Sequence, residues 1–354
     1  MEKELTPSAT AATHALRVAK VVRETVDACS IVFEIPEALR SVFRYRAGQF
    51  VTLHVPYGGK TLSRCYSLAS SPDTEAEHKI TIKRVAAGRI SSWINDNVKA
   101  GDVLECLPPG GLFVLNDSTS DLVMFAGGSG ITPVISLIKT ALAKTSRRIR
   151  LVYANRNLVS VIFRAELDAL VAKHPGRFEV IYRYDDSDGF ADVHHVRAWA
   201  ADRRGAECYV CGPAEFMSIV ERGLIEEGVG AEHIHIERFV SPPDPDEKAA
   251  AEAAAPAAST EGAPASISIH LDGKRHDVPY KEGQTVLVAC QSAGLRPPFS
   301  CTEAFCGCCM AKLVSGQVRM KHNDFLSKKE VAQGWVLTCQ SVPLTPDVEI
   351  RYPD

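Results

Sequence analysis

The first third of the chain alternates apolar and polar residues over short stretches. Glycine and proline turns break these stretches at intervals of about ten residues. The stretches read RVAKVVRE (17–24), SIVFEI (30–35), QFVTLHV (49–55), HKITIKRV (78–85) and DVLECL (102–107). Because a period of two places alternate side chains on one face of a strand, residues 1–118 are expected to form an antiparallel β-barrel or sandwich.

After residue 118 the pattern changes to uninterrupted apolar runs separated by helical stretches. The apolar runs are DLVMFAGG (121–128), IRLVYANR (149–156), FEVIYRY (178–184) and ECYVCGP (207–213). Helices are expected over residues 132–143, 164–173 and 214–227. Since a strand that is buried on both faces reads as a continuous apolar run, residues 119–240 are expected to form an α/β domain with a parallel sheet.

Residues 241–265 differ in composition from both neighbours. They are rich in proline, alanine and acidic groups and contain no aromatic or large aliphatic residue, so we interpret them as a flexible linker. The tail, residues 266–354, returns to alternation in SISIHLDGKRHDVPY, where Asp272-Gly273 predicts a hairpin turn, and a helix follows near 285–293. Three domains and a linker are therefore expected.

Composition and charge exclude several classes of protein. The 354 residues are 45% hydrophobic and 23% charged, as in globular proteins. Forty basic residues against 43 acidic ones give a net charge of −3, which removes the main driving force for binding nucleic acid. No apolar stretch approaches the roughly 20 residues that cross a bilayer, and the N-terminus does not resemble a secretory signal. We expect a cytoplasmic protein that neither binds nucleic acid nor spans a membrane.

The eleven cysteines supply the most specific chemical signal. An odd number without a secretion signal favours metal-binding thiolates over disulfides. Cys301-x4-Cys306-x2-Cys309, followed after 29 intervening residues by Cys339, matches the plant-type [2Fe–2S] pattern. Zinc sites usually show paired C-x2-C units, and only one such pair with the right partner occurs here. We predict that these four thiolates hold a [2Fe–2S] cluster and that Cys308 is an ordinary buried thiol.

Two segments in the first domain suit a flavin nucleotide. In RCYS, Arg64 can grip a pyrophosphate, Tyr66 can stack on an aromatic ring, and Ser67 offers a hydroxyl. The segment KRVAAGRISSW (83–93) carries a strand into a glycine turn and a helix start, where N–H groups and serine hydroxyls can hold a phosphate. Each motif is weak alone, but together they predict FAD or a related flavin.

A glycine-rich turn follows the first apolar strand of the second domain. In AGGSGITP (126–133) the glycines allow a phosphate to approach the backbone, Thr132 can cap a helix, and Pro133 suits its first turn. The dinucleotide motif G-x-G-x-x-G is incomplete, because Pro133 stands at the third glycine. The turn Cys211-Gly212-Pro213 closes a later strand, where a doubly wound sheet places its ligand.

These motifs in this order resemble the ferredoxin–NADP reductase family. The front 240 residues are similar to its FAD-binding β-barrel and pyridine-nucleotide domain, and the tail resembles plant-type ferredoxins, which implies a β-grasp fold. Ferredoxin placed at the C-terminus is similar to the reductase components of bacterial multicomponent oxygenases. RCYSL, YANR, SVIF and CGP resemble most the reductases of 3-ketosteroid 9α-hydroxylases, with phenylacetyl-CoA epoxidase reductases as near relatives.

The resemblance implies roles for individual residues. Ser67 would face the flavin N5, Cys211 would lie near the nicotinamide, and Glu237 would meet the other face of the flavin; these are the candidate catalytic residues, which tune or position the reacting groups. The remaining implied cofactor-binding positions are Arg64, Tyr66, Lys83, Gly88, Ser91, Ser92 and Phe239 for FAD, and Gly128, Gly130, Thr132, Pro133, Gly212 and Pro213 for the nucleotide. Cys308 departs from the small residue usual between the second and third cluster ligands.

The implied chemistry is electron transfer. Hydride transfer delivers two electrons at once, whereas the iron centre of an oxygenase accepts them singly, and a flavin followed by a one-electron cluster connects the two. We therefore predict that electrons pass from NAD(P)H to FAD, to the cluster and to a terminal oxygenase, with steroid metabolism as the implied setting. A stand-alone flavin reductase (diaphorase) and an iron–sulfur redox sensor are the alternatives, although complete flavin and nucleotide motifs weigh against a pure sensor.

The preferred nucleotide depends on the ends of two strands. Arg156 could hold a 2′-phosphate, which favours NADPH. Asp185 and Asp186, after the next strand, could instead bind ribose hydroxyls or repel that phosphate. The resemblance makes NADH the prediction.

Overall fold

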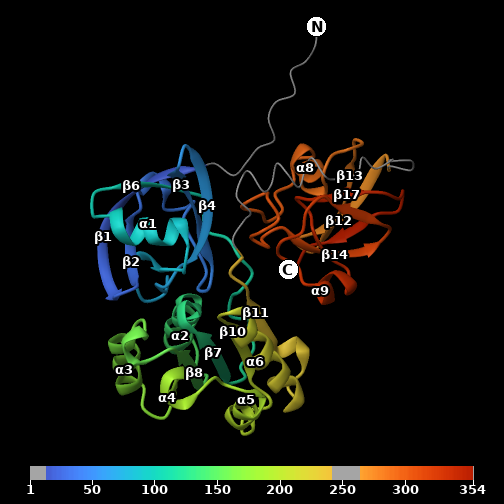
Figure 1. Ribbon diagram of the computed structural model, residues 1–354. Helices are drawn as coiled ribbons and strands as arrows, with labels where there is room; N and C mark the ends of the chain where they lie inside the picture. The colour runs from blue at the N-terminus through green and yellow to red at the C-terminus, as the bar shows by residue number, and fades with distance from the viewer. Residues whose placement is uncertain (1–12, 241–263, 354) are drawn as a thin grey trace. The chain divides into compact units, whose positions relative to one another are not determined.

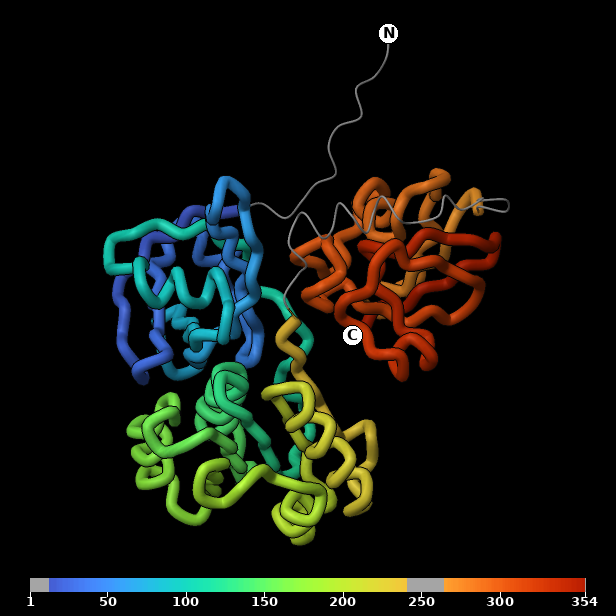
Figure 2. Tube along the Cα trace, viewed as in Figure 1, coloured from blue at the N-terminus to red at the C-terminus, as the bar shows by residue number. Residues whose placement is uncertain are grey.

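The computed structural model describes residues 13–240 and 264–353. Apart from Pro264 and Ala265, the predicted linker lies outside the described residues. Figures 1 and 2 show the first domain in blue and cyan, the second in green to yellow, and the third in orange to red. Residues Ala15–Val55 and Tyr66–Phe239 form one compact unit, and the C-terminal domain is described by itself.

The first domain is a six-stranded antiparallel barrel. Its strands are β1 (His14–Thr25), β2 (Ala28–Glu34), β3 (Phe50–Tyr57), β4 (Lys60–Ser67), β5 (His78–Lys83) and β6 (Val103–Cys106), with a short 3-10 helix η1 (Glu37–Leu39). The strand order is β4-β3-β6-β1-β2-β5, and a bridge from Leu68, just after β4, to Ile80 in β5 closes the sheet. Helix α1 (Arg89–Asn97) contacts β5 and buries Ile90 and Ile94. The predicted barrel is confirmed.

The second domain is built on a five-stranded parallel sheet. Its strands are β7 (Leu122–Gly127), β8 (Ile149–Asn155), β9 (Phe178–Tyr184), β10 (Glu207–Cys211) and β11 (Ile234–Glu237). All four neighbouring pairs in the order β11-β10-β7-β8-β9 are parallel, which confirms the predicted α/β domain. Because the chain starts at β7 and later returns to its other side, the order reverses between β7 and β10, and a crevice is expected at the carboxyl ends of these strands.

Helices cover both faces of this sheet (Figure 1). The longer ones are α2 (Ile131–Lys144), α3 (Arg164–Lys173), α5 (Val193–Ala200) and α6 (Ala214–Glu226); α4 (Asp185–Asp188) and the 3-10 turns η2 (Gly128–Gly130), η3 (Leu158–Ser160) and η4 (Ala231–His233) are short. One core packs α2 and α3 against the sheet, and a second packs α5 and α6. The helices expected from the sequence correspond to α2, α3 and α6, whereas α5 was not expected.

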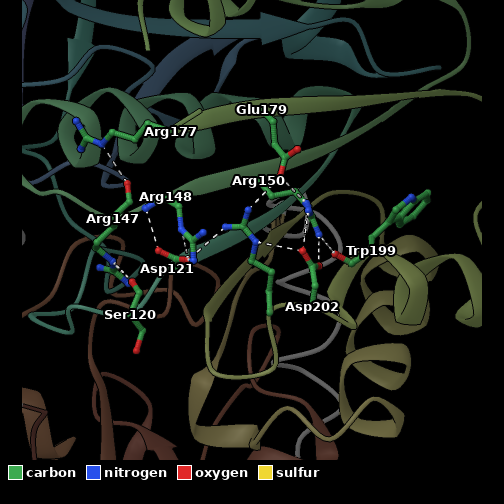
Figure 3. Close-up of polar contacts among 10 residues, drawn as sticks. Ser120, Asp121, Arg147, Arg148, Arg150, Arg177, Glu179, Trp199 and Asp202 are labelled. Carbon is green, nitrogen blue, oxygen red and sulfur yellow. Dashed lines mark hydrogen bonds and ion pairs between the residues drawn. The ribbon is translucent and has the colours of Figure 1, made fainter. Parts of the chain in front are cut away.

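A network of arginines and acids joins the amino ends of β7, β8 and β9 (Figure 3). Arg148 and Arg203 donate hydrogen bonds to the Asp121 carboxylate. Arg150 donates hydrogen bonds to the carboxylates of Glu179 and Asp202. Arg177 donates to the Ala141 and Leu142 carbonyls at the end of α2. These contacts stabilise the edge of the sheet opposite the glycine turns.

The C-terminal domain has a mixed five-stranded sheet with its own core. It contains β12 (Ser266–Leu271), β13 (Lys274–Pro279), α8 (Val286–Ser292), β14 (Met310–Ser315), β15 (Val318–Met320), α9 (Lys328–Ala332), β16 (Trp335–Leu337), β17 (Ser341–Pro343) and β18 (Glu349–Arg351). In the order β13-β12-β18-β14-β16, only β12 and β18 are parallel, and α8 packs into the core, as in a β-grasp fold. Asp272 (φ 52°) and Gly273 (φ 69°) form the expected hairpin turn. The predicted fold is confirmed.

Candidate redox site

Two segments of the C-terminal domain bring four cysteines together. Cys301, Cys306 and Cys309 lie in the loop before β14, and Cys339 follows β16; all four side chains are buried. The backbone N–H and the hydroxyl of Thr338 donate to the Cys309 carbonyl over 3.1 and 3.0 Å, which holds the fourth cysteine beside the third. Spacing along the sequence and proximity in the fold therefore select the same four residues.

The four sulfurs are arranged as two pairs. Cys301 interacts with Cys306, and Cys309 with Cys339. The Cys309 side chain lowers the pKa of Cys339, while its nearness to Cys339 and burial raise the pKa of Cys309. In residues 13–240 and 264–353 no three His, Cys, Asp or Glu side chains converge on a single metal ion. Two sulfurs for each of two irons is the arrangement that a [2Fe–2S] cluster uses, so the donor set fits it.

N–H groups of the chain point at these sulfurs. Cys301 N donates to Cys306 Sγ over 3.4 Å, Glu303 N to Cys301 Sγ over 3.3 Å, and Gln340 Nε2 to Cys339 Sγ over 3.7 Å. Gly307 has a φ of 68°, and a Cβ there would lie 2.4 Å from the Phe325 ring, so only glycine fits this part of the loop. Donors aimed at thiolate sulfurs stabilise negative charge and raise a cluster's potential.

Cys308 lies between the ligand positions without completing a pair. Its side chain is 2% exposed and interacts with that of Cys306. It is therefore a buried thiol, as expected, in contact with one proposed ligand.

In the barrel, the residues expected at the flavin lie on β4 and at the start of α1. Arg64 and Tyr66 are two residues apart on β4 and half-buried, whereas Ser67 is 3% exposed. Because side chains two apart share a strand face, Arg64 and Tyr66 point to the same side.

The loop before α1 is stabilised by contacts among its own residues and the first turn of the helix. Ser91 Oγ accepts from Val85 N over 3.1 Å, and a Cβ on Gly88 would lie 2.6 Å from that oxygen. No side chain of the described residues caps α1, whose N-cap is Gly88. Backbone N–H groups at an uncapped helix start suit a diphosphate, so this loop, with Ser91 and Ser92, fits that part of FAD.

The two turns expected at the pyridine nucleotide contact each other at the carboxyl ends of β7 and β10. A Cβ on Gly130 would lie 2.1 Å from the Cys211 carbonyl oxygen, and one on Gly127 would lie 2.8 Å from Pro213. This close backbone approach leaves no room for larger residues, and it lies where a crevice is expected at the strand-order reversal. Gly128, Gly130, Gly212 and Pro213 thus lie in one place.

The start of α2 differs in detail from the expectation. Its N-cap is Gly130, so Thr132 and Pro133 lie inside the first turn, and both are buried. The Thr132 hydroxyl donates to the Ser129 carbonyl over 3.0 Å, so it stabilises the turn and does not cap the helix.

Lys83 also reaches this crevice. Its Nζ lies 3.5 Å from the position of a Cβ on Gly128, which places the ammonium beside the glycine turn of the second domain. Burial lowers the pKa of Lys83, and Asp27 acts in the opposite direction. The structure thus brings this lysine to the nucleotide turn, whereas the resemblance implied a place at the FAD diphosphate.

Two residues of β8 that sequence reasoning missed support the same turn. Tyr153 is fully buried, and its hydroxyl donates to the Gly128 carbonyl over 3.0 Å. Asn155 is 4% exposed, and its amide interacts with the Tyr153 side chain. Tyr153 thereby holds the backbone of the glycine turn in place. The only sequence signal was their period of two along YANR.

Cys211 and Glu237 pair across β10 and β11 at the same edge. They are register partners, and both are buried. Burial raises the pKa of the Glu237 carboxyl to about 8, although Arg238 acts in the opposite direction. Burial and then Glu237 raise the pKa of the Cys211 thiol well above its usual value. At neutral pH both groups are protonated and can donate hydrogen bonds. Phe239, two residues later, is 48% exposed.

Three models of known domain families match the chain in the order that the motifs predicted. An oxidoreductase FAD-binding domain matches residues 15–115, an oxidoreductase NAD-binding domain matches 124–222, and a 2Fe-2S iron-sulfur cluster binding domain matches 269–344. The chain is therefore an oxidoreductase with FAD, NAD(H) and [2Fe–2S] sites.

Curated relatives share this whole arrangement. The ferredoxin reductase component of 3-ketosteroid-9-alpha-monooxygenase from Rhodococcus rhodochrous is 39% identical over 341 residues, 95% of this chain and 96% of the relative. The chain belongs to this family of oxygenase reductase components. A component of the 1,2-phenylacetyl-CoA epoxidase from Escherichia coli is 31% identical over 355 residues, 96% of this chain and 97% of the relative. The resemblance read from the sequence is confirmed.

A solved structure of comparable architecture supports the fold. Phthalate dioxygenase reductase, described as a modular structure for electron transfer from pyridine nucleotides to [2Fe-2S], aligns with a TM-score of 0.59 at 22% identity. The alignment covers 96% of this chain and 98% of that one.

Proposed function

We propose that this chain is the reductase component of a multicomponent monooxygenase and passes electrons from NADH to a terminal oxygenase. The observation that carries the proposal is that one chain combines two contacting glycine-containing turns at the ends of β7 and β10, a helix start without a side-chain cap that suits a flavin diphosphate, and two pairs of buried thiols. Bound FAD would accept a hydride and release electrons singly, and a bound [2Fe–2S] cluster would carry one electron at a time.

In this proposal the residues of the chain bind and orient these groups. The glycine turns and Lys83 hold the pyrophosphate of the nucleotide, because backbone N–H groups and an ammonium attract phosphate. Arg64, Tyr66 and Ser67 hold the flavin, with Gly88, Ser91 and Ser92 at its diphosphate. Glu237 and Cys211 keep their protons at neutral pH and donate hydrogen bonds at the nicotinamide end, with Phe239 near the flavin.

In this proposal, electrons leave the protein through the C-terminal domain. Cys301, Cys306, Cys309 and Cys339 bind the cluster, and the N–H groups directed at their sulfurs set its potential. We propose domain limits at 1–118, 119–240 and 266–354, with 241–265 as the linker.

The names of the relatives guide the choice of partner. They are components of a ketosteroid monooxygenase and of a phenylacetyl-CoA epoxidase. We propose a terminal oxygenase as the acceptor here, of the 3-ketosteroid 9α-hydroxylase type, in the cytoplasm, where cysteines stay reduced. No helix in the described part of the chain is long and apolar enough to cross a membrane. A stand-alone diaphorase is the second candidate, because flavin and nucleotide sites alone would suffice for it.

An anaerobic titration of the purified protein with NADH tests the proposal. We expect the visible bands of flavin and cluster to bleach together at stoichiometric NADH, and the reduced protein to transfer electrons to an oxygenase of the ketosteroid type. Flavin bleaching with an oxidised cluster would favour the diaphorase. A colourless preparation that cannot be reconstituted with flavin and iron would refute both.

A further inference from the structure

An ion pair joins the first two domains beside the nucleotide crevice. Arg156 directly follows β8, and Asp27 lies in the turn between β1 and β2. Arg156 Nη2 donates to Asp27 Oδ2 over 3.0 Å. The arginine side chain is 70% exposed, whereas the aspartate is 19% exposed. The arginine can therefore be reached by a ligand, but its partner carboxylate is already in place.

The Asp27 carboxylate is held in this orientation from its own turn. The Thr25 hydroxyl donates to Asp27 Oδ1 over 2.7 Å, and the Asp27 carbonyl accepts from Arg84 N over 2.7 Å. One carboxylate oxygen is thus bound locally and the other is presented to Arg156. A fixed acid needs little reorganisation to keep the arginine paired.

The position of Arg156 in the sheet indicates which part of the nucleotide the ion pair would meet. β8 lies next to β7, the strand that ends in the glycine turn. In dinucleotide-binding sheets the residue at the end of this second strand meets the adenosine ribose, where an arginine accommodates a 2′-phosphate and an acid accepts from the 2′-hydroxyl. Arg156 alone would favour NADPH, but here its guanidinium is paired with the Asp27 carboxylate of the barrel.

Other charged residues lie near the Asp27–Arg156 pair. Asp186 N donates to the Arg156 carbonyl, which places Asp185 and Asp186 beside the arginine's backbone. Lys83 interacts with both Asp27 and Arg156. Asp27, Arg156 and Lys83 therefore form one charged group, and the backbone of Asp186 is bonded to that of Arg156.

We propose that Asp27, a residue of the FAD-binding barrel, makes the nucleotide site select NADH over NADPH by holding Arg156 and by repelling a 2′-phosphate. The inference rests on the proposed function, in which NAD(P)H is the reductant. It assigns the choice of nucleotide partly to the first domain, whereas the sequence placed it only in the second.

Substitution of Asp27 tests this directly. In Asp27→Asn the amide keeps the shape and the Thr25 contact but loses the charge. We expect the ratio of kcat/KM for NADPH to that for NADH, measured with a dye acceptor, to rise about tenfold, the size expected when one unit charge near a phosphate is removed. Adding Arg156→Gln to Asp27→Asn should cancel the gain, because the arginine is then the phosphate's partner.

Glu24→Gln is the matched control. It removes one negative charge three residues away, at the end of β1, where Glu24 accepts a hydrogen bond from the Ser30 hydroxyl. The nucleotide ratio should not change in this variant. A similar rise in Glu24→Gln would mean that general charge is responsible, and the proposal would be wrong.

Binding of 2′,5′-ADP, measured by calorimetry, separates this inference from the proposed function, because it needs neither hydride transfer nor an acceptor. We expect Asp27→Asn to bind 2′,5′-ADP about tenfold more tightly than the wild type, with 5′-AMP as the reference. Equal affinities in the two proteins, or a wild type that prefers NADPH, would overturn the inference. A protein that binds these nucleotides as expected but accepts hydride from neither NADH nor NADPH would refute the proposed function and leave the inference on binding standing.

Discussion

At the scale of single residues, burial determines the protonation state of the Glu237 carboxyl. The residue is 9% exposed and lies at the end of β11 beside Cys211. Burial disfavours the carboxylate and raises the pKa to about 8. A neutral acid can donate a hydrogen bond without adding a negative charge at the proposed flavin and nicotinamide site.

The Glu237→Gln variant tests this state. Deprotonation of Glu237 above pH 8 should slow flavin reduction by NADH, about tenfold for each further pH unit, since only the protonated form is competent. The amide of Glu237→Gln cannot ionise, so stopped-flow rates between pH 6 and 9 should lose the break near pH 8. Glu207→Gln, at the amino end of β10, should keep it. A break that persists in Glu237→Gln would assign it to another group.

The same residue links pH to stability. Because its folded-state pKa of about 8 lies above the ordinary value of 4.5, the favourable contribution is complete below pH 4.5 and is lost as the pH rises to 8. Urea unfolding should show wild-type stability falling between pH 5 and 8 more steeply than that of Glu237→Gln. Parallel pH profiles would contradict the raised pKa.

Cys308 and Cys306 offer a second comparison between neighbours. Both are buried, but only Cys306 forms one of the two sulfur pairs with Cys301. Cys308→Ser should keep about two irons per chain and the visible spectrum of a [2Fe–2S] cluster, whereas Cys306→Ser should lose most of both. Iron analysis and electron paramagnetic resonance of the reduced proteins measure this. Equal loss in the two variants would make Cys308 a ligand.

At the scale of elements, α2 connects the two N-terminal domains. Its first turn lies at the glycine loop, and one of its faces packs on barrel residues 69–75. Lys139 is 6% exposed and donates to the Ala69 carbonyl and to both oxygens of Glu75, and it also pairs with Glu166. The Ser136 hydroxyl donates to the Ser70 carbonyl over 2.5 Å. The helix that carries the nucleotide turn is thereby fixed to the domain that is proposed to hold the flavin.

Lys139→Met should therefore destabilise this unit strongly. Removing the cation takes a close partner from the half-buried carboxylates of Glu75 and Glu166, which Lys79 still pairs, and costs about 2 kcal/mol of unfolding free energy. Lys144→Met on the same helix removes an exposed pair with Asp73, 3.4 Å away, and should cost about 0.5 kcal/mol or less. Urea unfolding followed by near-UV circular dichroism compares them. Similar losses in the two variants would show that the buried cluster adds nothing beyond a surface pair.

The sequence predicted features that depend on neighbouring residues, but it did not predict contacts between residues far apart along the chain. Strand periodicity, the Asp272-Gly273 turn and the spacing of the four cysteines depend on neighbours along the chain, and the structure contains each of the corresponding elements. No pattern along the sequence indicated that Lys139 is buried, because its partner Glu75 is 64 residues away. Asp27 and Arg156 are 129 residues apart, so no local pattern could connect them. The fold class could be predicted from pattern, but contacts between domains could not.

At the scale of the whole molecule, electrons are proposed to enter and leave through units with separate cores. The core of the C-terminal domain is formed by its own residues, including Ile269, Ala289 and Ile350. The glycine turns that are proposed to bind the nucleotide belong to the other compact unit. A change in a cluster ligand should therefore leave the flavin and nucleotide sites folded.

Cys339→Ser makes this separation measurable. Flavin reduction by NADH should keep its wild-type rate, and a two-electron dye that accepts from the flavin should still be reduced. Transfer to cytochrome c, which accepts single electrons, should fall at least about tenfold, because the one-electron carrier is missing. Cys290→Ala, which changes a buried cysteine of the same core that belongs to neither sulfur pair, serves as the control and should retain both activities. If Cys339→Ser also lost flavin reduction, the two units would depend on each other for folding. If it kept cytochrome c reduction in full, the cluster would not lie on the route of the electrons.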